Sequence, residues 1–460
     1  MTKRLLFLFA ILPSMLLAQH TIKGTFTPAN QFKFAFLYRV TPETSLFVAN
    51  ADVDENGKFE LKLDSTKIII PGTYRIVYAQ PQNEYNFDII VNGKEDIELT
   101  FDFEKGLSFN KSQENRLYKS YNRSIALVNR SIRNYYGSQK EDKEGFTKIF
   151  NILNKTQTEF ENAAEGMIVK EFIKACKPYI PSDYEDVATF SKNVKTNYFK
   201  NIDFNNKTLQ NSNFLIKNAT SFVYNFIESN NPNPSYKENI DTVVNAIGNN
   251  PVVKKVILKI LWNHFADDEN EDVANYITDN YLLIIAKIDK DQELVDTITY
   301  FKNASIGNIA PDFEFELKNE KDKTVTKKLS ELNTSEKYLV IFWNSSCSHC
   351  LDEMPMLRKY SEGYDEAQFK VIAVALDTDI YRWKNMTYDY PDFIHVFGEG
   401  KWENEIGNRY NAKATPSYFV LDKDKKIMSK PYDFPEFKNY FESLSIKKKM
   451  ITKEKTEKEN

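Results

Sequence analysis

The spacing of hydrophobic positions changes twice along the chain. Between residues 19 and 107, short aromatic and β-branched runs show apolar and polar side chains in alternation, and turn signals such as Asn92-Gly93 separate them. Alternation of this kind, broken by frequent turns, is typical of strands in a sandwich or small barrel. We therefore predict an antiparallel β-sandwich at residues 19–107, with strands near residue 26 and at 32–36, 46–49, 59–63, 74–78, 87–91 and 97–103.

Residues 108–302 follow a helical period instead. Leu117, Tyr121, Ile125, Val128 and Ile132 recur at three- and four-residue steps, which places them on one face of an amphipathic helix. Similar spacing recurs up to residue 302, without a fixed repeat that would indicate a solenoid. This part of the chain is predicted to be an α-helical region.

The last block, residues 303–445, alternates strands with helices. The continuous apolar runs at 338–343 and 369–376 flank a helical segment at 347–362. Strands without alternation are buried on both faces, so this βαβ unit predicts a parallel pair inside a covered sheet. Residues 418–421 and 426–428 predict an antiparallel hairpin. The fold class is therefore multidomain α+β, with a charged tail at 446–460.

The first 18 residues have the pattern of an export signal. Lys3 and Arg4 precede an apolar run from Leu5 to Ala18, which is shorter than the ~20 residues that a membrane-spanning helix requires. We predict a signal peptide at residues 1–18, cleaved after Ala18, and a periplasmic location. The alternatives are an uncleaved membrane anchor and a buried N-terminal helix.

Composition narrows the classes of function. The chain of 460 residues is 42% hydrophobic and 27% charged, which excludes disorder as its main state. Its 61 basic and 65 acidic residues give a net charge of -4, which argues against a nucleic-acid partner. Three cysteines are too few for a disulfide scaffold, but two of them, Cys347 and Cys350, are three positions apart.

Cys347 and Cys350 carry the candidate chemistry. They follow a predicted buried strand and open a helix, where free N–H groups and the helix dipole stabilise an anion. Cys347, nearer the exposed end, is expected to attack a disulfide as a thiolate, and Cys350, one turn further in, to resolve the mixed disulfide. A structural zinc site requires four ligands, and only Cys176 remains, so no metal is predicted. Cys176 itself is expected to be a buried, unreactive thiol.

Two neighbours could assist these thiols. The His349 imidazole could favour the Cys347 thiolate through charge or a hydrogen bond, or it could simply face solvent. Glu353, one helical turn beyond Cys350, could accept its proton, or it could be an ordinary surface glutamate. Further along, Thr415-Pro416 immediately precedes an apolar strand, where a cis peptide bond is plausible.

Together these motifs resemble the TlpA/ResA-like thiol-disulfide oxidoreductases of the thioredoxin superfamily. The matching residues are Ala310-Pro311-Asp312-Phe313, Phe342-Trp343, Cys347-Ser348-His349-Cys350, Glu353-Met354-Pro355 and Thr415-Pro416. The resemblance implies a thioredoxin-like α/β domain at residues 303–445. Residues 19–107 are also similar, more weakly, to a β-rich domain of unknown function that precedes such modules in envelope proteins.

The resemblance also implies roles for particular residues. Cys347 would be the nucleophile, Cys350 the resolving thiol and Glu353 a residue that tunes proton transfer, while Thr415 and Pro416 would touch bound substrate. Ser346 stands where the family commonly has tryptophan, so docking and redox potential are expected to differ. No cofactor is implied beyond a redox-active Cys347–Cys350 disulfide. The partners would be protein disulfides and a membrane or periplasmic thiol donor of electrons, with the direction of flow left open.

Two other functions remain as alternatives at this point. The sandwich and helices could make the protein an envelope scaffold that uses the thioredoxin-like domain only for docking. A peroxide-reducing thiol enzyme would have Thr or Ser three residues before the attacking cysteine, where this chain has Asn344.

Overall fold

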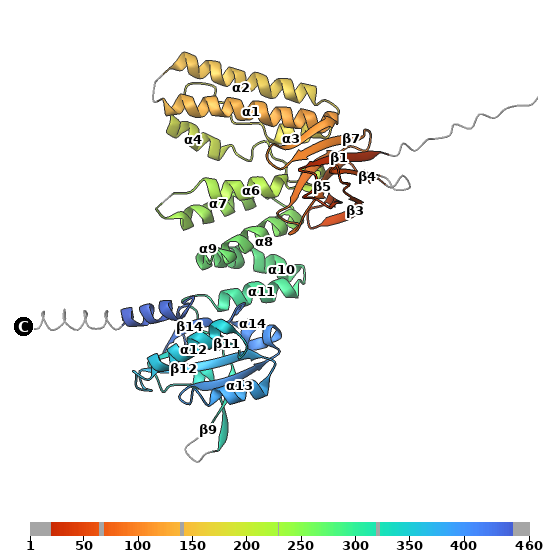
Figure 1. Ribbon diagram of the computed structural model, residues 1–460. Coiled ribbons are helices and arrows are strands. Elements are labelled where there is room, and N and C mark those ends of the chain that lie inside the picture. Colours follow the sequence, from red (N-terminus) through yellow and green to blue (C-terminus); the bar gives the residue numbers. More distant parts are fainter. Residues whose placement is uncertain (1–19, 64–68, 139–141, 229, 319–322, 445–460) are drawn as a thin grey trace, which may run out of the picture. The chain divides into compact units, whose positions relative to one another are not determined.

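The computed structural model describes residues 20–63, 69–138, 142–228, 230–318 and 323–444 (Figure 1). The predicted signal peptide at 1–18 and the charged tail at 446–460 lie outside the described residues. The chain divides into two compact units, Met1–Ile257 and Leu258–Asn460. The division falls inside helix α8 (Pro251–Asp267), so the helical region does not form a unit of its own but is shared between the two.

The first unit begins with two four-stranded sheets whose orders are β4-β1-β7-β8 and β3-β2-β5-β6. Both sheets contribute to one hydrophobic core, as in a sandwich, because alternate residues of each strand face inward. The strands are β1 Thr21–Thr27, β2 Phe34–Val40, β3 Ser45–Asp52, β4 Lys58–Lys62, β5 Gly72–Val77, β6 Asn86–Val91, β7 Ile97–Asp102 and β8 Gly106–Lys111.

Two features of this sandwich differ from the prediction. Strand β1 pairs with β7 in parallel, so the sandwich is not purely antiparallel. Strand pairing is decided by the tertiary fold, and the alternation of side chains along β1 is the same in either direction. Strand β8 also carries the sheet past residue 107 as far as Lys111, where only weak alternation marks the strand.

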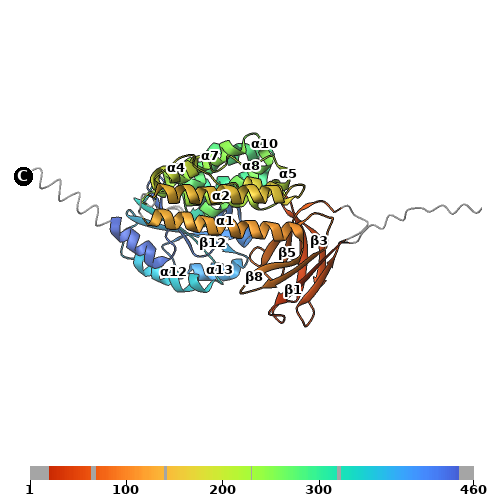
Figure 2. The same cartoon turned by 90° about the horizontal axis from the view of Figure 1, so that it is seen from above.

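Helices complete the first unit. Helix α1 starts against the sandwich, where Ser112 caps it by accepting a hydrogen bond from the N–H of Asn115, and it packs on β6, β8, α2 and α3 (Figure 2). The helices are α1 Gln113–Gly137, α2 Lys143–Ala163, α3 Val169–Ala175, α4 Val187–Thr196, α5 Lys207–Gln210, α6 Phe214–Asn225 and α7 Pro232–Ile247, followed by α8.

The second unit joins short helices to an α/β domain. Helices α9 (Glu271–Ile277), α10 (Leu283–Ile288) and α11 (Gln292–Asn303), with a π-helical turn at Thr278–Leu282, precede the domain. Glu271 connects the two parts: its carboxylate accepts a hydrogen bond from the N–H of Ile306 at 2.7 Å and pairs with Lys430 at 2.7 Å. The α/β domain therefore has a fixed attachment to the helices that precede it within this unit.

A five-stranded sheet in the order β13-β12-β11-β14-β15 forms the centre of the α/β domain. The predicted parallel pair is confirmed by β11 and β12, and the predicted hairpin by the antiparallel β14 and β15. The elements are β11 Lys337–Trp343, α12 Ser348–Ser361, β12 Phe369–Asp377, α13 Ile380–Thr387, β13 Ile394–Glu399, α14 Glu405–Arg409, β14 Ser417–Asp422 and β15 Ile427–Ser429. Two 3-10 turns, Leu329–Glu331 and Lys401–Glu403, and a helix at 434–444 complete them.

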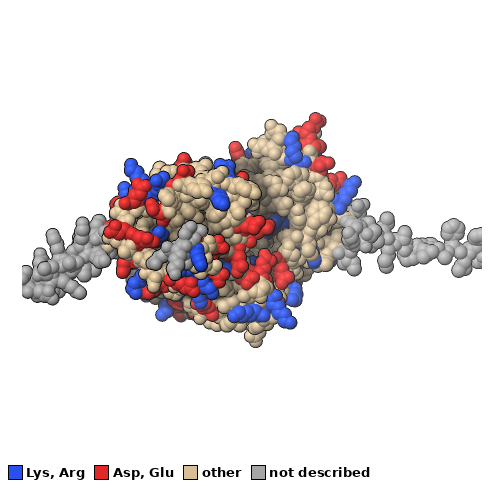
Figure 3. Space-filling model, turned by 90° about the horizontal axis from the view of Figure 1, so that it is seen from below, with Lys and Arg blue, Asp and Glu red and all other residues tan. Residues whose placement is uncertain are grey.

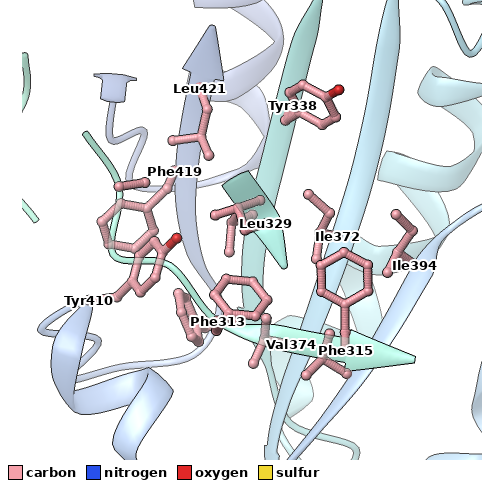
Figure 4. Close-up of a cluster of buried hydrophobic side chains, with 14 of the residues drawn as sticks. Phe313, Phe315, Leu329, Tyr338, Ile372, Val374, Ile394, Tyr410, Phe419 and Leu421 are labelled. Atoms are coloured by element: carbon pink, nitrogen blue, oxygen red, sulfur yellow. The ribbon is translucent and has the colours of Figure 1, made fainter. Parts of the chain in front are cut away.

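The sheet is covered on both faces, which explains its continuous apolar strands. Alternate residues of β11 and β12 enter different cores: Phe342 and Ile372 lie on one face, and Ile341 and Ala373 on the other. Figure 4 shows the first of these cores, where Phe313 also packs on the sheet. This core is joined by a two-stranded ribbon, β9 Glu314–Lys318 and β10 Thr324–Lys328, which was not predicted.

Charge and hydropathy of the described residues add two facts. Acidic and basic side chains are interspersed over the face shown in Figure 3. In the part of the chain that the structure describes, none of the helices combines the length and the apolar character needed to span a bilayer.

Candidate active site

Cys347 lies at the junction between the central strand and helix α12. Strand β11 ends at Trp343, and Cys347 is the residue that caps the start of α12. The intervening loop is tight: the N–H of Cys347 donates to the carbonyl of Asn344 at 3.2 Å, and the buried Asn344 side chain donates to the Leu376 carbonyl at 2.6 Å. Asn344 thereby ties the loop to strand β12 and fixes where the helix begins.

Asp377, the last residue of β12, is hydrogen-bonded to the same loop. Its buried carboxylate accepts hydrogen bonds from the N–H of Ser345 at 2.8 Å, of Thr378 at 2.7 Å and of Asp379 at 3.0 Å. Burial raises the pKa of Asp377, but hydrogen bonds with Ser345 and these backbone amides outweigh it and leave the pKa below its ordinary value. The loop is therefore held by an ionised side chain.

The environment of Cys347 favours its thiolate. Partial burial raises its pKa, but hydrogen bonds from the Cys350 N–H, the Cys350 side chain, Thr415 and the His349 N–H prevail and lower the pKa below its ordinary value. The thiol is half-buried, so a large partner can reach it. As a thiol, it donates to the Thr415 carbonyl at 3.2 Å.

Cys350 has the opposite character. It is fully buried, one turn inside α12, in a core that includes Trp343, Met354 and Tyr418. Burial raises the pKa of Cys350 to about 12, assisted by its hydrogen bond and charge interaction with Cys347. All three cysteines are free thiols in the structure. One accessible, acidified thiol next to one occluded thiol is the arrangement that disulfide exchange requires.

The loop of Thr415 and Pro416 faces the two thiols. The Thr415–Pro416 peptide bond is cis, as the sequence suggested. Both residues are half-buried and lead into strand β14 at Ser417. Thr415 interacts with both Cys347 and Cys350, so this loop forms one wall of the site.

Glu353 is half-buried and makes two specific hydrogen bonds. Its Oε2 accepts from the hydroxyl of Tyr418 at 2.6 Å and from the N–H of Phe434 at 3.1 Å. Burial and the neighbouring Glu353 carboxylate raise the pKa of Tyr418, so its hydroxyl stays protonated at neutral pH. Since Tyr418 shares a core with Cys350, the carboxylate is connected by Tyr418 to the surroundings of the buried thiol.

His349 and Ser346 lie at the exposed rim. The structure places the His349 side chain in solvent, and the interaction of His349 with Cys347 goes through its backbone N–H. Ser346 is exposed, with its N–H and hydroxyl directed to Asn344 Oδ1 at 2.8 and 2.6 Å. Neither side chain is hydrogen-bonded to Cys347 or Cys350 among the described residues.

The sequence analysis missed Asp377 and Tyr418 as site residues. Asp377 ends an apolar strand next to the nucleophile strand, and the carboxyl ends of parallel strands meet at one edge, so this position could have been found. Tyr418 lacks such a signal, because its contact with Glu353 crosses 65 residues of sequence. Among the described residues, no group of three or more His, Cys, Asp or Glu side chains is arranged to hold a metal ion.

Comparisons with known proteins find similarity in the part of the chain that contains Cys347 and Cys350. The family model described as Redoxin matches residues 305–444. The chain is 30% identical to "Thiol-disulfide oxidoreductase ResA" of Bacillus cereus over 89 residues. These residues make up 19% of this chain and 50% of the relative, so the chain spans about half the length of the curated relative that it matches.

Two solved structures are similar to this chain at low overall similarity. A thioredoxin-like protein from Bacteroides caccae is 17% identical, with a TM-score of 0.38, and the match covers 57% of this chain and 96% of that chain. The C-terminal domain of a putative thiol-disulfide oxidoreductase from Bacteroides thetaiotaomicron is 26% identical, with a TM-score of 0.26, covering 31% of this chain and 96% of that one.

Proposed function

We propose that the protein is a thiol-disulfide oxidoreductase that reduces disulfides in envelope proteins through Cys347 and Cys350. The observation that carries this proposal is the contrast inside one helical turn: Cys347 is half-exposed with a lowered pKa, whereas Cys350 is buried with a pKa of about 12. The Redoxin match and the similarity to ResA support the same chemistry.

The proposed reaction has two exchange steps. The Cys347 thiolate attacks one sulfur of a substrate disulfide, forming a mixed disulfide and releasing the other sulfur as a thiolate, which takes up a proton. Cys350 then loses its proton and attacks Cys347 Sγ, so that the second substrate thiol leaves and a Cys347–Cys350 disulfide forms. Two electrons have passed to the substrate, and an external dithiol donor must restore the reduced pair.

The surroundings fit these steps. A thiol with a pKa of about 12 must lose a proton to act at neutral pH, and Glu353 is the acceptor that we assign to it, with Tyr418 between them. Thr415 and Pro416 border the attacking thiol and would contact the substrate chain. Ser346, in place of a bulky side chain, leaves the rim next to Cys347 open.

Trapping of the mixed disulfide tests the proposal. With insulin as the disulfide-bonded probe, the Cys350→Ser variant should accumulate a covalent, reductant-sensitive adduct, because the resolving thiol is missing. Cys347→Ser should form no adduct and should not reduce insulin, and Cys176→Ser is the matched control that should behave as wild type. Full insulin reduction by Cys347→Ser would contradict the proposal; partner capture without any thiol dependence would favour a scaffold.

The direction of electron flow has its own test. A Cys347/Cys350 reduction potential near that of thioredoxin, about -270 mV, would agree with a reductase, whereas a value near -120 mV would show an oxidant. Export is proposed from Lys3, Arg4 and the apolar run that ends at Ala18. N-terminal sequencing of protein from the envelope fraction should find Gln19 first; Met1 at the terminus would contradict cleavage.

A further inference from the structure

The first unit has a cavity of about 400 Å³ between the sandwich and the helices, and this cavity is partly open to solvent. Strands β6 and β8 are edges of the two sheets and pack on α1, and residues of α3 and of the start of α6 complete the lining. The lining residues are mainly apolar and aromatic and include Ile90, Phe109, Tyr118, Phe172 and Phe214. Ligand sites commonly have this size and character and occur where two structural layers meet.

Two polar side chains of the lining, Asn115 and Asp88, are already paired within the protein. The side-chain amide of Asn115 accepts from the Ile90 N–H at 2.8 Å and donates to the Ile90 carbonyl at 2.7 Å, which satisfies the free edge of β6. The Asp88 carboxylate is paired with Arg75 through hydrogen bonds of 2.8 and 3.1 Å. These groups therefore shape the cavity, and Asp88 brings little free negative charge to it.

The remaining charged groups of the lining are lysines. Lys119 of α1 and Lys217 of α6 are both exposed. The Lys119 ammonium donates a hydrogen bond to the carbonyl of Leu107. The Lys217 ammonium makes no hydrogen bond or ion pair with a described residue, although its charge acts on Cys176, where it partly opposes the burial that raises the pKa of that thiol. An ammonium group beside an aromatic cavity favours a ligand with an anionic head and an apolar body.

We propose that this cavity binds an amphipathic carboxylate, with its apolar body between the aromatic walls and its carboxylate on the Lys217 ammonium. A volume of about 400 Å³ lies within the range of small-molecule sites. We choose a ten-carbon fatty acid as the probe. The site is separate from Cys347 and Cys350, and its occupation does not depend on redox chemistry.

Titration calorimetry with decanoate, below its micellar concentration, tests the proposal on the full chain. The expected result is saturable binding of one decanoate per chain, with 1-decanol at least fivefold weaker and decyltrimethylammonium weaker still. Lys217→Met should weaken decanoate about fivefold or more and leave decanol unchanged. Lys148→Met, an exposed lysine of α2 outside the cavity, is the matched control and should bind decanoate as wild type does.

A second variant tests the apolar wall. Phe214→Ala should weaken decanoate and decanol equally, and a thermal melt of the variant shows whether it is folded. The proposal is overturned if decanoate does not saturate one site, if Lys217→Met binds it as tightly as wild type, or if the cationic probe binds as well as the carboxylate. Insulin reduction should be unchanged in Lys217→Met. Loss of decanoate binding and loss of the thiol chemistry are therefore distinguishable.

Discussion

Cys347 lies at the start of one helix and Cys176 at the end of another, and the pKa values of their thiols are shifted in opposite directions. Cys347 caps the start of α12, whereas Cys176 follows the last residue of α3 in the first unit. Hydrogen bonds at the helix start lower the pKa of Cys347, while burial raises the pKa of Cys176 to about 11 despite its hydrogen bond with Tyr118. The comparison teaches that the two thiols, both half-buried, differ in pKa because hydrogen bonding prevails at Cys347 and burial prevails at Cys176.

The largest effect expected from this comparison is on turnover. Cys347→Ser should lower insulin reduction by roughly three orders of magnitude or more, because a serine hydroxyl is not ionised at neutral pH. Cys176→Ser should stay within about twofold of wild type, since the raised pKa of about 11 keeps that thiol protonated at neutral pH. Steady-state assays of both variants provide the measurement, and a matching loss in Cys176→Ser would break the comparison.

A second effect concerns the loop that positions Cys347. Asp377→Asn removes an ionised acceptor of three backbone N–H groups, which should lower the free energy of unfolding by about 2 kcal/mol. Because folding lowers the pKa of Asp377, its stabilisation is complete above the ordinary value of 3.8 and is lost as the pH falls through the lower folded value.

Denaturant unfolding at neutral pH and between pH 2 and 5 measures both parts of this prediction. Wild type should lose stability toward the acid end more steeply than Asp377→Asn. Asp352→Asn, an exposed carboxylate of α12, serves as the control and should follow wild type. Equal stability and equal acid sensitivity of Asp377→Asn and wild type would show that the loop does not depend on this carboxylate.

The smallest effect sharpens the contrast between Cys347 and Cys350. Tyr418→Phe removes the 2.6 Å hydrogen bond to Glu353 and should cost about 1 kcal/mol of stability. Release of substrate from the mixed disulfide should also slow and shift in pH dependence, as it should in Glu353→Gln. The double variant should be no slower than Glu353→Gln alone, since both changes interrupt one path. If Tyr418→Phe releases substrate from the mixed disulfide at the wild-type rate and with the wild-type pH dependence, Tyr418 does not take part in proton transfer from Cys350 to Glu353.

Local patterns predict the parts of this structure that local forces decide. The apolar run at 338–343 indicated burial on both faces, and β11 does supply alternate residues to two cores. Cys347 and Cys350 follow this run directly, so the sequence also predicted that they lie at the start of a helix. In contrast, the parallel pairing of β1 with β7 and the contacts of Glu353 with Tyr418 and Phe434 join distant segments, so tertiary packing alone decides them.

The central claim is that Cys347 is held as an accessible thiolate. Its alkylation by iodoacetamide across a pH series, followed by peptide mass spectrometry on the reduced wild-type chain, tests this directly. We expect Cys347 to react first, with a midpoint below the ordinary thiol pKa, while Cys350 and Cys176 react only near their values of about 12 and 11. A Cys347 that is alkylated no faster than Cys176, or that titrates like a free cysteine, would contradict the account.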